Sequence, residues 1–203
     1  MNKFYITTPL YYVNDEPHIG HAYTTILADV INRYYKSIGY QTFMLTGTDE
    51  HGLKVQQAAI KNNVSPKQHV DDYVKRFKKT WKKLNIEYDY FIRTTNSNHI
   101  KKVQKVLQNL YDKGDIYLDE YEGLYSISEE RFITEKEAEE GDYREIKKIK
   151  EKNYFFKMSK YQKKLIRHIE QNKNFIKPET RKNEILGFLK NPLNDLCISR
   201  PKS

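Results

Sequence analysis

The chain has 203 residues, of which 31% are charged, and its 36 Lys and Arg outnumber 27 Asp and Glu to leave a net charge of +9. This length accommodates one large domain, or one domain carrying a second, with a core that needs no disulfides. The positive charge favours an anionic partner such as RNA or a nucleotide phosphate, but a lysine-rich solvated surface explains it equally well.

Cys197 is the single cysteine, which excludes an intrachain disulfide and a zinc site with two thiolates. The first residues lack the unbroken apolar core of a signal peptide, and no later apolar run is long enough to span a bilayer. We therefore expect a cytoplasmic protein that has no membrane partner.

The chain opens with a predicted strand, helix and strand. Phe4 to Thr8 is β-branched and aromatic, which predicts a short buried strand ended by Pro9. From Gly20 to Gly39, apolar residues at helical spacing predict a helix of about four turns, and Thr42 to Thr46 predicts a second strand. Together they form a right-handed βαβ unit of a parallel sheet, half of a nucleotide-binding type of fold. The apolar helix residues are Ala22, Ile26, Leu27, Val30, Ile31 and Tyr34.

Two further helices are expected to cover this sheet. The first begins at Ser65-Pro66-Lys67-Gln68, which combines a capping Ser with Pro at the first helical position, and it runs to about Leu84. The second is capped by Asn96 or Ser97 and ends before Gly114. Its shared apolar face consists of Ile100, Val103, Leu107, Leu110 and Tyr111.

The character of the chain changes near Asp115. Short segments rich in Tyr and Glu follow as far as Lys152, and they predict an inserted β-rich module with strands at Ile116 to Tyr121 and Leu124 to Ser128. Two helical stretches then follow, at Lys160 to Gln171 and Arg181 to Lys190.

A histidine pair marks the point where the first strand passes into the first helix. The sequence His18-Ile19-Gly20-His21 places two imidazoles three residues apart at a helix N-terminus, where both can face one phosphate. An adenylating enzyme needs this, because charge builds on the α-phosphate as pyrophosphate leaves. Gly20 also lets a flat base approach the backbone. Taken alone, however, two such histidines more often cap a helix or pack in a core.

A second polar cluster follows the second strand. Thr46-Gly47-Thr48-Asp49-Glu50-His51-Gly52 lies at the carboxyl edge of the predicted sheet, beside the histidine loop. On its own it describes an ordinary polar turn. Two polar clusters at adjacent strand ends favour a pocket for an amino acid and ATP, in which the Asp49 carboxylate is the natural partner of an α-amino group.

These motifs resemble those of one known family. The run from Thr7 to Tyr23, with His18-Ile19-Gly20-His21 within it, is similar to the first signature of bacterial methionyl-tRNA synthetases, and Gly47 to Gly52 is similar to their second block. The resemblance covers nearly the whole chain. It continues through Trp81, Phe91-Ile92-Arg93-Thr94-Thr95, Tyr121-Glu122-Gly123-Leu124-Tyr125, Asn153-Tyr154-Phe155-Phe156 and Ile198-Ser199-Arg200.

The resemblance implies an α/β fold: residues 1–114 as the first half of a class I Rossmann-like catalytic domain, and 115–203 as an inserted β-rich connective module. It implies activation of methionine by ATP with Mg²⁺, then transfer to tRNA(Met). His18 and His21 would stabilise the α-phosphate and Gly20 would lie against adenine. The Leu10 backbone, Tyr12 and Asp49 would bind methionine.

The chain departs from the family at the lysine loop. Members use a Lys-Met-Ser-Lys-Ser loop far downstream to neutralise pyrophosphate. Lys157-Met158-Ser159-Lys160-Tyr161 imitates it, but this stretch follows an aromatic run within the inserted module and leads into a helix. We therefore interpret it as a lookalike. The chain is expected to be an N-terminal fragment, from a truncated form or a broken gene, that makes no adenylate at a useful rate by itself.

Many members carry a zinc knuckle in the inserted module. At the matching places this chain has Ser126 and Glu129, which cannot replace thiolates, so no structural zinc is expected. Hydrogen bonds and the aromatic residues Tyr121, Tyr125 and Phe132 would hold the module together instead.

Two alternatives remain. Small adenylyltransferases also use a His-x-Gly-His loop on a nucleotide fold, but they are compact single domains without the insertion after Asp115 or the second polar cluster. The other alternative is a noncatalytic remnant whose basic surface still binds the acceptor end of tRNA.

Overall fold

The computed structural model describes residues 1–126, 131–133, 135–141, 143 and 145–199. The chain divides into two compact units, Met1–Gln104 and Lys105–Ser203. The boundary falls inside a helix that leaves the first unit and enters the second.

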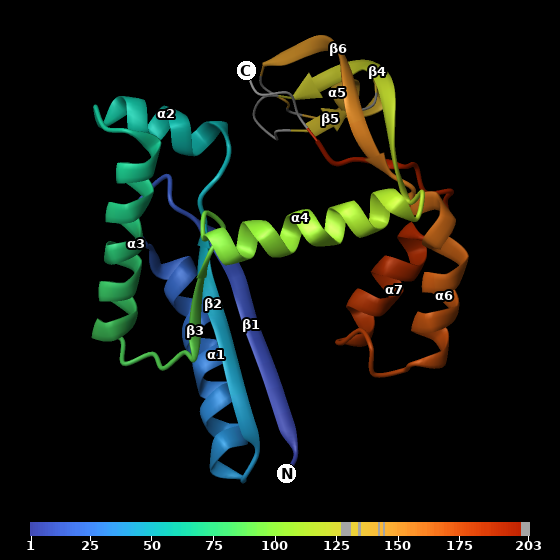
Figure 1. The fold of residues 1–203 in the computed structure, drawn as a ribbon. Coiled ribbons are helices and arrows are strands. Elements are labelled where there is room, and N and C mark those ends of the chain that lie inside the picture. The colour runs from blue at the N-terminus through green and yellow to red at the C-terminus, as the bar shows by residue number, and fades with distance from the viewer. Residues whose placement is uncertain (127–130, 134, 142, 144, 200–203) are drawn as a thin grey trace. The chain divides into compact units, whose positions relative to one another are not determined.

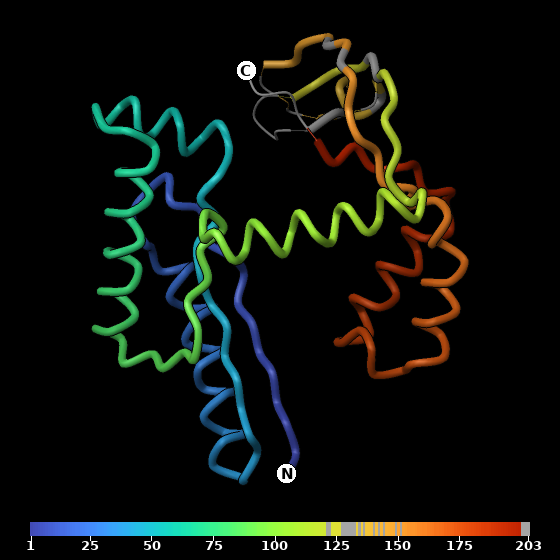
Figure 2. Tube along the Cα trace, in the orientation of Figure 1, coloured from blue at the N-terminus to red at the C-terminus, as the bar shows by residue number. Residues whose placement is uncertain are grey.

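The first unit is built on a parallel sheet of strand order β1-β2-β3. The helices α1 and α3 pack on one face of it, and the core lies between them and the sheet (Figures 1 and 2). The predicted βαβ unit is therefore confirmed. The elements are β1 (Lys3–Tyr12), α1 (Ile19–Ser37), β2 (Gln41–Asp49), α2 (Leu53–Lys61), α3 (Pro66–Lys83), β3 (Tyr90–Arg93) and α4 (Ser97–Asp112).

β1 does not end at Pro9, as the sequence predicted, but continues to Tyr12. The pairing register between β1 and β2 shifts between Thr7 and Leu10, so Pro9 lies in an irregularity where a missing backbone N–H breaks no regular ladder. The shift also exchanges the two faces of the strand. Before it, Phe4 stacks against Tyr35 of α1, and after it Tyr11 is the residue that meets α1.

α1 begins and ends where expected, since Gly39 follows it with φ of +86° and donates its N–H to the Lys36 carbonyl. Its buried residues are Thr25, Ala28, Asp29 and Asn32. Four of the six apolar residues that predicted the helix are exposed, from 39% for Ile26 to 59% for Tyr34, while Ala22 and Ile31 are partly buried. The orientation of α1 is explained by polar contacts: Tyr11 Oη lies 2.8 Å from Thr25 Oγ1, and Asp29 Oδ1 accepts from the Glu87 N–H.

The helix α3 confirms its predicted start, because Ser65 Oγ accepts from the Gln68 N–H at 3.2 Å. It places Phe77 and Trp81 in the core. The prediction that the next helix covers the sheet is wrong. All residues of α4 are described and none of them is buried, so its apolar face makes no core in either unit.

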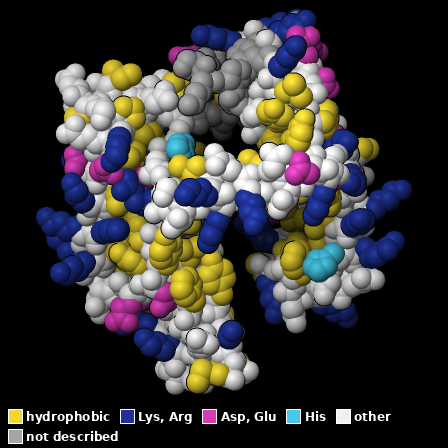
Figure 3. Space-filling view, in the orientation of Figure 1, with side chains coloured by type: hydrophobic (Ala, Val, Ile, Leu, Met, Phe, Trp, Pro, Cys, Tyr) yellow, Lys and Arg dark blue, Asp and Glu magenta, His cyan; other side chains and the backbone are white. Residues whose placement is uncertain are grey.

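The sheet face opposite α1 is apolar and exposed. Tyr5 of β1 is paired with Phe43 of β2, and Tyr90 of β3 is paired with Leu45, two positions further along the same face of β2. Between 45% and 61% of Tyr5, Phe43 and Tyr90 is exposed. Figure 3 shows hydrophobic side chains gathered over these strands.

Among the described helices, none has both the length and the apolar character needed to cross a membrane.

The second unit contains an antiparallel sheet of order β5-β4-β6-β7. The two strands predicted after Asp115 are one continuous strand, β4, and residues 127 and 128 lie outside the described part. β4 pairs along its whole length with β6. The sequence did not predict β6, because its many charged residues do not resemble a strand pattern. The elements are β4 (Ile116–Ser126), β5 (Arg131–Ile133), α5 (Glu135–Glu140), β6 (Ile146–Phe156), η1 (Met158–Tyr161), α6 (Gln162–Gln171), α7 (Glu179–Phe188) and β7 (Leu196–Cys197).

The two predicted C-terminal helices are present as α6 and α7, and the 3-10 turn η1 precedes α6. Ile169, Leu189 and Leu193 form a small buried cluster between them. This cluster is separate from the core of the first unit.

Candidate active site

The loop between β1 and α1 is held in place by α3. The buried His69 ring, 1% exposed, has its Nε2 at 2.8 Å from the Val13 carbonyl and its Nδ1 at 3.3 Å from the Asn62 amide. Arg76, also on α3, forms an ion pair with Glu16. His69 was not singled out from the sequence, because a lone histidine inside a helical pattern carries no signal of its own.

The loop delivers His18 and His21 as a stacked pair at the start of α1. Their ring centroids lie 3.7 Å apart with an interplanar angle of 22°. His18 is the N-cap residue, and its Nδ1 accepts from the Gly20 N–H at 3.1 Å, while His21 Nδ1 accepts from the His18 N–H at 3.3 Å. The histidines therefore do cap the helix, as the simpler interpretation required. Because each Nδ1 is an acceptor, the proton of each neutral ring lies on Nε2.

The environment keeps His21 neutral. Burial lowers the pKa of His21 below its ordinary value, and the positive charge that His18 can carry lowers it further. The ring centroid of His21 lies 4.8 Å from that of Tyr11 and 5.3 Å from that of Phe77. At neutral pH this imidazole is thus a hydrogen-bond donor through Nε2 rather than a cation.

Gly20 has a local structural role beside the one expected of it. A Cβ at this position would lie 3.0 Å from His18 Cε1 and 3.2 Å from His18 Nδ1. The absence of a side chain therefore leaves room for the His18 ring.

The residues expected to bind methionine lie together at the carboxyl ends of β1 and β2. Leu10 is opposite Gly47 and Tyr12 is opposite Asp49 in the register after the shift. These positions belong to the face away from α1, since Tyr11 between them points toward α1. Asp49 is half-buried and Tyr12 is 45% exposed. The structure thus places the histidines and Asp49 at the same end of the sheet, but on opposite faces of it.

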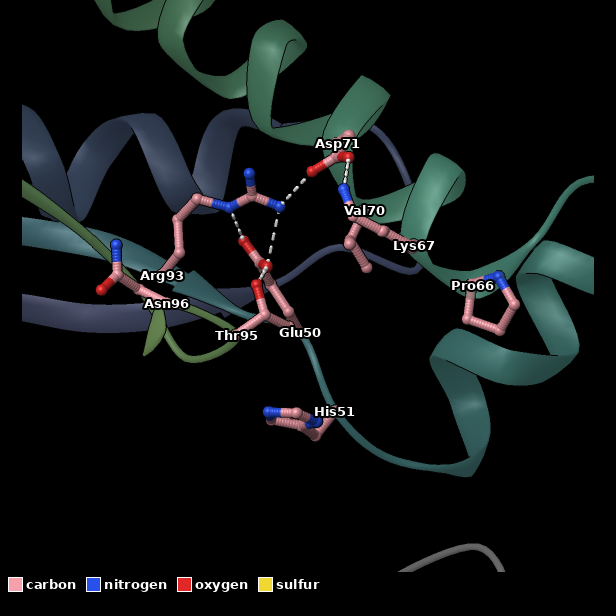
Figure 4. A pocket seen from close by; sticks show the side chains of 9 residues that line it. All are labelled: Glu50, His51, Pro66, Lys67, Val70, Asp71, Arg93, Thr95 and Asn96. Atoms are coloured by element: carbon pink, nitrogen blue, oxygen red, sulfur yellow. Dashed lines mark hydrogen bonds and ion pairs between the residues drawn. The ribbon is translucent and has the colours of Figure 1, made fainter. Parts of the chain in front are cut away.

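Glu50, next to Asp49, has a different surrounding. Its side chain is fully buried and forms ion pairs with Arg93 at the end of β3. Arg93 also contacts Asp71 on α3 at 2.7 Å (Figure 4). Hydrogen bonds from Lys67 and Arg93 lower the pKa of Asp71, and the hydrogen bond to Glu50 raises the pKa of Arg93. The sequence offered one signal, because alternation along β2 puts a carboxylate at a buried position that requires a cation.

A cavity of about 440 Å³ adjoins this network, and Figure 4 shows the side chains around it. Its lining comes from the ends of β2 and β3 and the first turns of α3. The residues are Glu50, His51, Pro66, Lys67, Val70, Asp71, Arg93, Thr95 and Asn96.

The lysine-loop lookalike is engaged in contacts within the second unit. The Lys160 ammonium forms an ion pair with the buried carboxylate of Asp115, and Tyr161 Oη donates to the same carboxylate at 2.6 Å. Ser159 Oγ donates to Asp195 at 2.6 Å, and Lys157 Nζ lies 5.4 Å from the Tyr117 ring centroid. These contacts give the segment a structural role.

The described residues contain no group of three or more His, Cys, Asp or Glu side chains that could hold a metal ion. Ser126 is buried at the end of β4, while Glu129 lies outside the described residues, as do the side chains of Tyr121 and Phe132. The expected lack of structural zinc therefore remains a prediction.

Comparisons with known proteins agree on one family. A family model described as tRNA synthetases class I (M) matches residues 4–142 and 138–203. The chain is 50% identical to the methionine–tRNA ligase of Clostridium perfringens, covering 97% of this chain and 31% of that protein. It is 51% identical to that of Clostridium acetobutylicum, covering 98% and 32%. The chain thus spans about a third of these relatives' length.

Solved structures give the same result. Mycobacterium tuberculosis methionyl-tRNA synthetase in complex with methionyl-adenylate superposes with a TM-score of 0.91 at 40% identity, covering 98% of this chain and 41% of that one. An Agrobacterium radiobacter leucyl-tRNA synthetase, at 22% identity and a TM-score of 0.77, shares the fold. With a family model that matches nearly its full length, the chain belongs to the class I tRNA synthetases of the (M) family.

Proposed function

We propose that the complete protein containing this chain is a cytoplasmic methionine–tRNA ligase. It would activate methionine with ATP and Mg²⁺ to methionyl-adenylate and transfer the methionyl group to tRNA(Met). The observation that carries this proposal is the geometry of His18 and His21, whose Nδ1 atoms are both used as acceptors inside the loop. The two Nε2–H groups are therefore the donors that remain for a phosphate.

In this proposal the two imidazoles stabilise the charge that develops on the α-phosphate. A carboxylate oxygen of methionine attacks the α-phosphorus, and the bond to the β-phosphate breaks as pyrophosphate leaves. Donors that are already oriented by Gly20 N–H and His18 N–H need no reorganisation during the step, and one such donor is typically worth about 3 kcal/mol. Gly20 would lie against adenine.

Methionine would approach from the other face of β1. Asp49 would accept the substrate ammonium, with Tyr12 opposite it in register and the Leu10 backbone beside them. This arrangement supports a substrate bound across the end of β1, with its carboxylate directed toward the histidines. In the second step a terminal ribose hydroxyl of the tRNA attacks the carbonyl carbon, and AMP leaves.

We also propose that residues 1–114 form half of the catalytic domain and that 115–203 form a connective module. Support comes from Gly114, which follows α4 with φ of +69° and separates it from β4. We propose that the chain alone is inactive. Lys160 of the lookalike segment forms an ion pair with Asp115 and would therefore not neutralise pyrophosphate.

The test is methionine-dependent ATP–pyrophosphate exchange. We expect the complete gene product to catalyse it and the 203-residue chain alone not to. Exchange by the chain alone would contradict its proposed inactivity. If the complete protein showed tRNA binding that falls steeply with salt but no exchange, the noncatalytic alternative would replace the proposed enzyme.

A further inference from the structure

The buried carboxylate of Glu50 is the centre of a network that the proposed chemistry does not use. Arg93 Nε lies 2.7 Å from Glu50 Oε1, and Arg93 Nη2 lies 2.9 Å from Oε2. Thr48 Oγ1 donates to Oε1 at 2.6 Å and Thr95 Oγ1 donates to Oε2. Each oxygen of the Glu50 carboxylate therefore has two donors. The bidentate contact with the Arg93 guanidinium compensates the negative charge of Glu50.

The network ties together three elements. Glu50 follows the last residue of β2, Arg93 is the last residue of β3, and Asp71 on α3 accepts from Arg93 Nη2 at 2.7 Å. The backbone is tied as well, because the Glu50 N–H donates to Thr94 Oγ1 at 2.8 Å and the Thr94 N–H donates to the Thr48 carbonyl at 3.3 Å.

Asp49 is the last residue of β2 and lies beyond the last residue pair between β2 and β3. The last residue pair between β2 and β3 is Thr48 with Arg93, so Asp49 has a strand partner on the β1 side, at Tyr12, and no paired residue in β3. Three residues later Gly52 adopts φ of 106° as the chain turns into α2. The next residue, Glu50, points to the opposite face of the strand, where Arg93 bonds both of its carboxylate oxygens.

We infer that Glu50 and Arg93 are positioning residues that fix the orientation of the Asp49 carboxylate toward the methionine ammonium. This inference rests on the proposed function. A lysine at position 93 would retain the charge but lose the planar fork that bonds both carboxylate oxygens at once. A glutamine at position 50 would retain the shape but lose the charge.

Variants of this network are expected to fold, because the adjoining cavity of about 440 Å³ leaves room for water beside an altered pair. Asp71 and its neighbour Asp72 provide a matched pair of controls. Both are on α3, but Asp71 contacts Arg93, whereas Asp72 contacts Lys75 in an exposed ion pair.

The experiment measures pyrophosphate exchange by the complete gene product carrying Glu50→Gln, Arg93→Lys, Asp71→Asn or Asp72→Asn. We expect Glu50→Gln and Arg93→Lys to raise the KM for methionine on the order of ten-fold, with the KM for ATP within about two-fold. Asp71→Asn should raise the KM for methionine less, and Asp72→Asn should leave it unchanged.

A merely structural role predicts a different result. Lower thermal midpoints and less active enzyme, with an unchanged KM for methionine in the remaining active fraction, would overturn the positioning role while leaving the proposed function intact. An equal rise in both KM values would also overturn it. Absence of methionine-dependent exchange in the unaltered complete protein would instead reject the proposed function, and the inference with it.

Discussion

Single polar residues determine how the first unit is arranged around its site. Thr25 and Asp29 turn α1 so that its polar side faces the sheet, and His69 fixes the loop that precedes His18. Thr25, Asp29 and His69 each have a hydrogen-bond partner, which offsets the cost of removing them from water. The loop that carries the histidine pair is consequently held by contacts with α3.

The first residue-scale prediction concerns the histidines. In the complete protein, His18→Asn and His21→Asn should each lower kcat for pyrophosphate exchange by about 10²- to 10³-fold, because each removes an oriented donor to the α-phosphate. His168→Asn, whose ring is in the second unit against Phe175, is the control and should leave kcat unchanged. Equal losses in all three variants would contradict the assigned roles.

A second residue-scale prediction concerns Gly47. A Cβ there would lie 2.1 Å from the Ile92 carbonyl oxygen of β3, which is backbone and cannot move aside. Gly47→Ala should therefore lower the free energy of unfolding by about 1–3 kcal/mol, measured by urea denaturation. Gly187→Ala in α7 is the control, since its Cβ would meet open space and helix propensity favours alanine by up to about 1 kcal/mol.

At the scale of elements, η1 connects the start of β4, the start of α6 and the segment after α7. It does so through Asp115 and Asp195, both of which accept bonds from the lookalike segment. These contacts lie within the segment's own unit, as expected if the motif is only a lookalike of the catalytic loop.

Replacing the lysine of this motif tests that interpretation. Lys160→Met keeps the aliphatic stem but leaves the buried Asp115 carboxylate without its cation, so the second unit should lose stability. The kcat per active site for pyrophosphate exchange by the complete protein should stay within about two-fold, because the residue takes no part in neutralising pyrophosphate. A large loss of kcat with unchanged stability would show that the segment is catalytic.

The carboxylates that contact η1, Asp115 and Asp195, predict a loss of stability at acidic pH. The hydrogen bond from Lys160, followed by that from Tyr161, lowers the pKa of Asp115. For Asp195, burial acts in the raising direction, but hydrogen bonds from Ser159 and Tyr117 leave its pKa lowered. A lowered folded pKa stabilises the fold above the unfolded value of about 3.9 and the benefit is lost as pH falls below it.

Thermal unfolding followed from pH 7 to pH 3 measures this effect. The thermal unfolding midpoint should decrease as the pH is lowered below about 4. The midpoint of Asp115→Asn should decrease less steeply over that interval, because one linked carboxylate is gone. A midpoint that rises on acidification would contradict the direction of both pKa shifts.

At the scale of the whole molecule, the exposed apolar sheet face has the clearest consequence. Tyr5, Phe43 and Tyr90 form it, and β1 pairs only with β2 among the described strands, which leaves one edge of β1 open. An open edge beside an apolar face favours strand pairing between molecules. On the face shown in Figure 3, by contrast, Lys and Arg side chains are spread over both units.

We therefore expect the 203-residue chain to self-associate as its concentration rises, which sedimentation velocity would detect. Tyr5→Lys should weaken the association by placing a charge on the face. Tyr23→Lys, at a position on α1 that is 71% exposed against 61% for Tyr5, is the control and should not weaken it. A chain that stays monomeric at every concentration would contradict the expectation.

The sequence by itself determined the features that depend on neighbouring residues. These are the βαβ order, the capped start of α3, the end of α1 at Gly39 and the two imidazoles at the start of α1, because periodicity and capping act over a few residues. The family signatures extended this to the proposed site.

Only the tertiary structure decided which faces and partners those elements have. Pro9 lies inside β1 because the register shifts there, α4 buries no residue, and Glu50 meets Arg93 although 43 positions separate them in the chain. The physical reason is common to all three: register, burial and ion pairing are set by contacts between distant segments, which local sequence patterns do not encode.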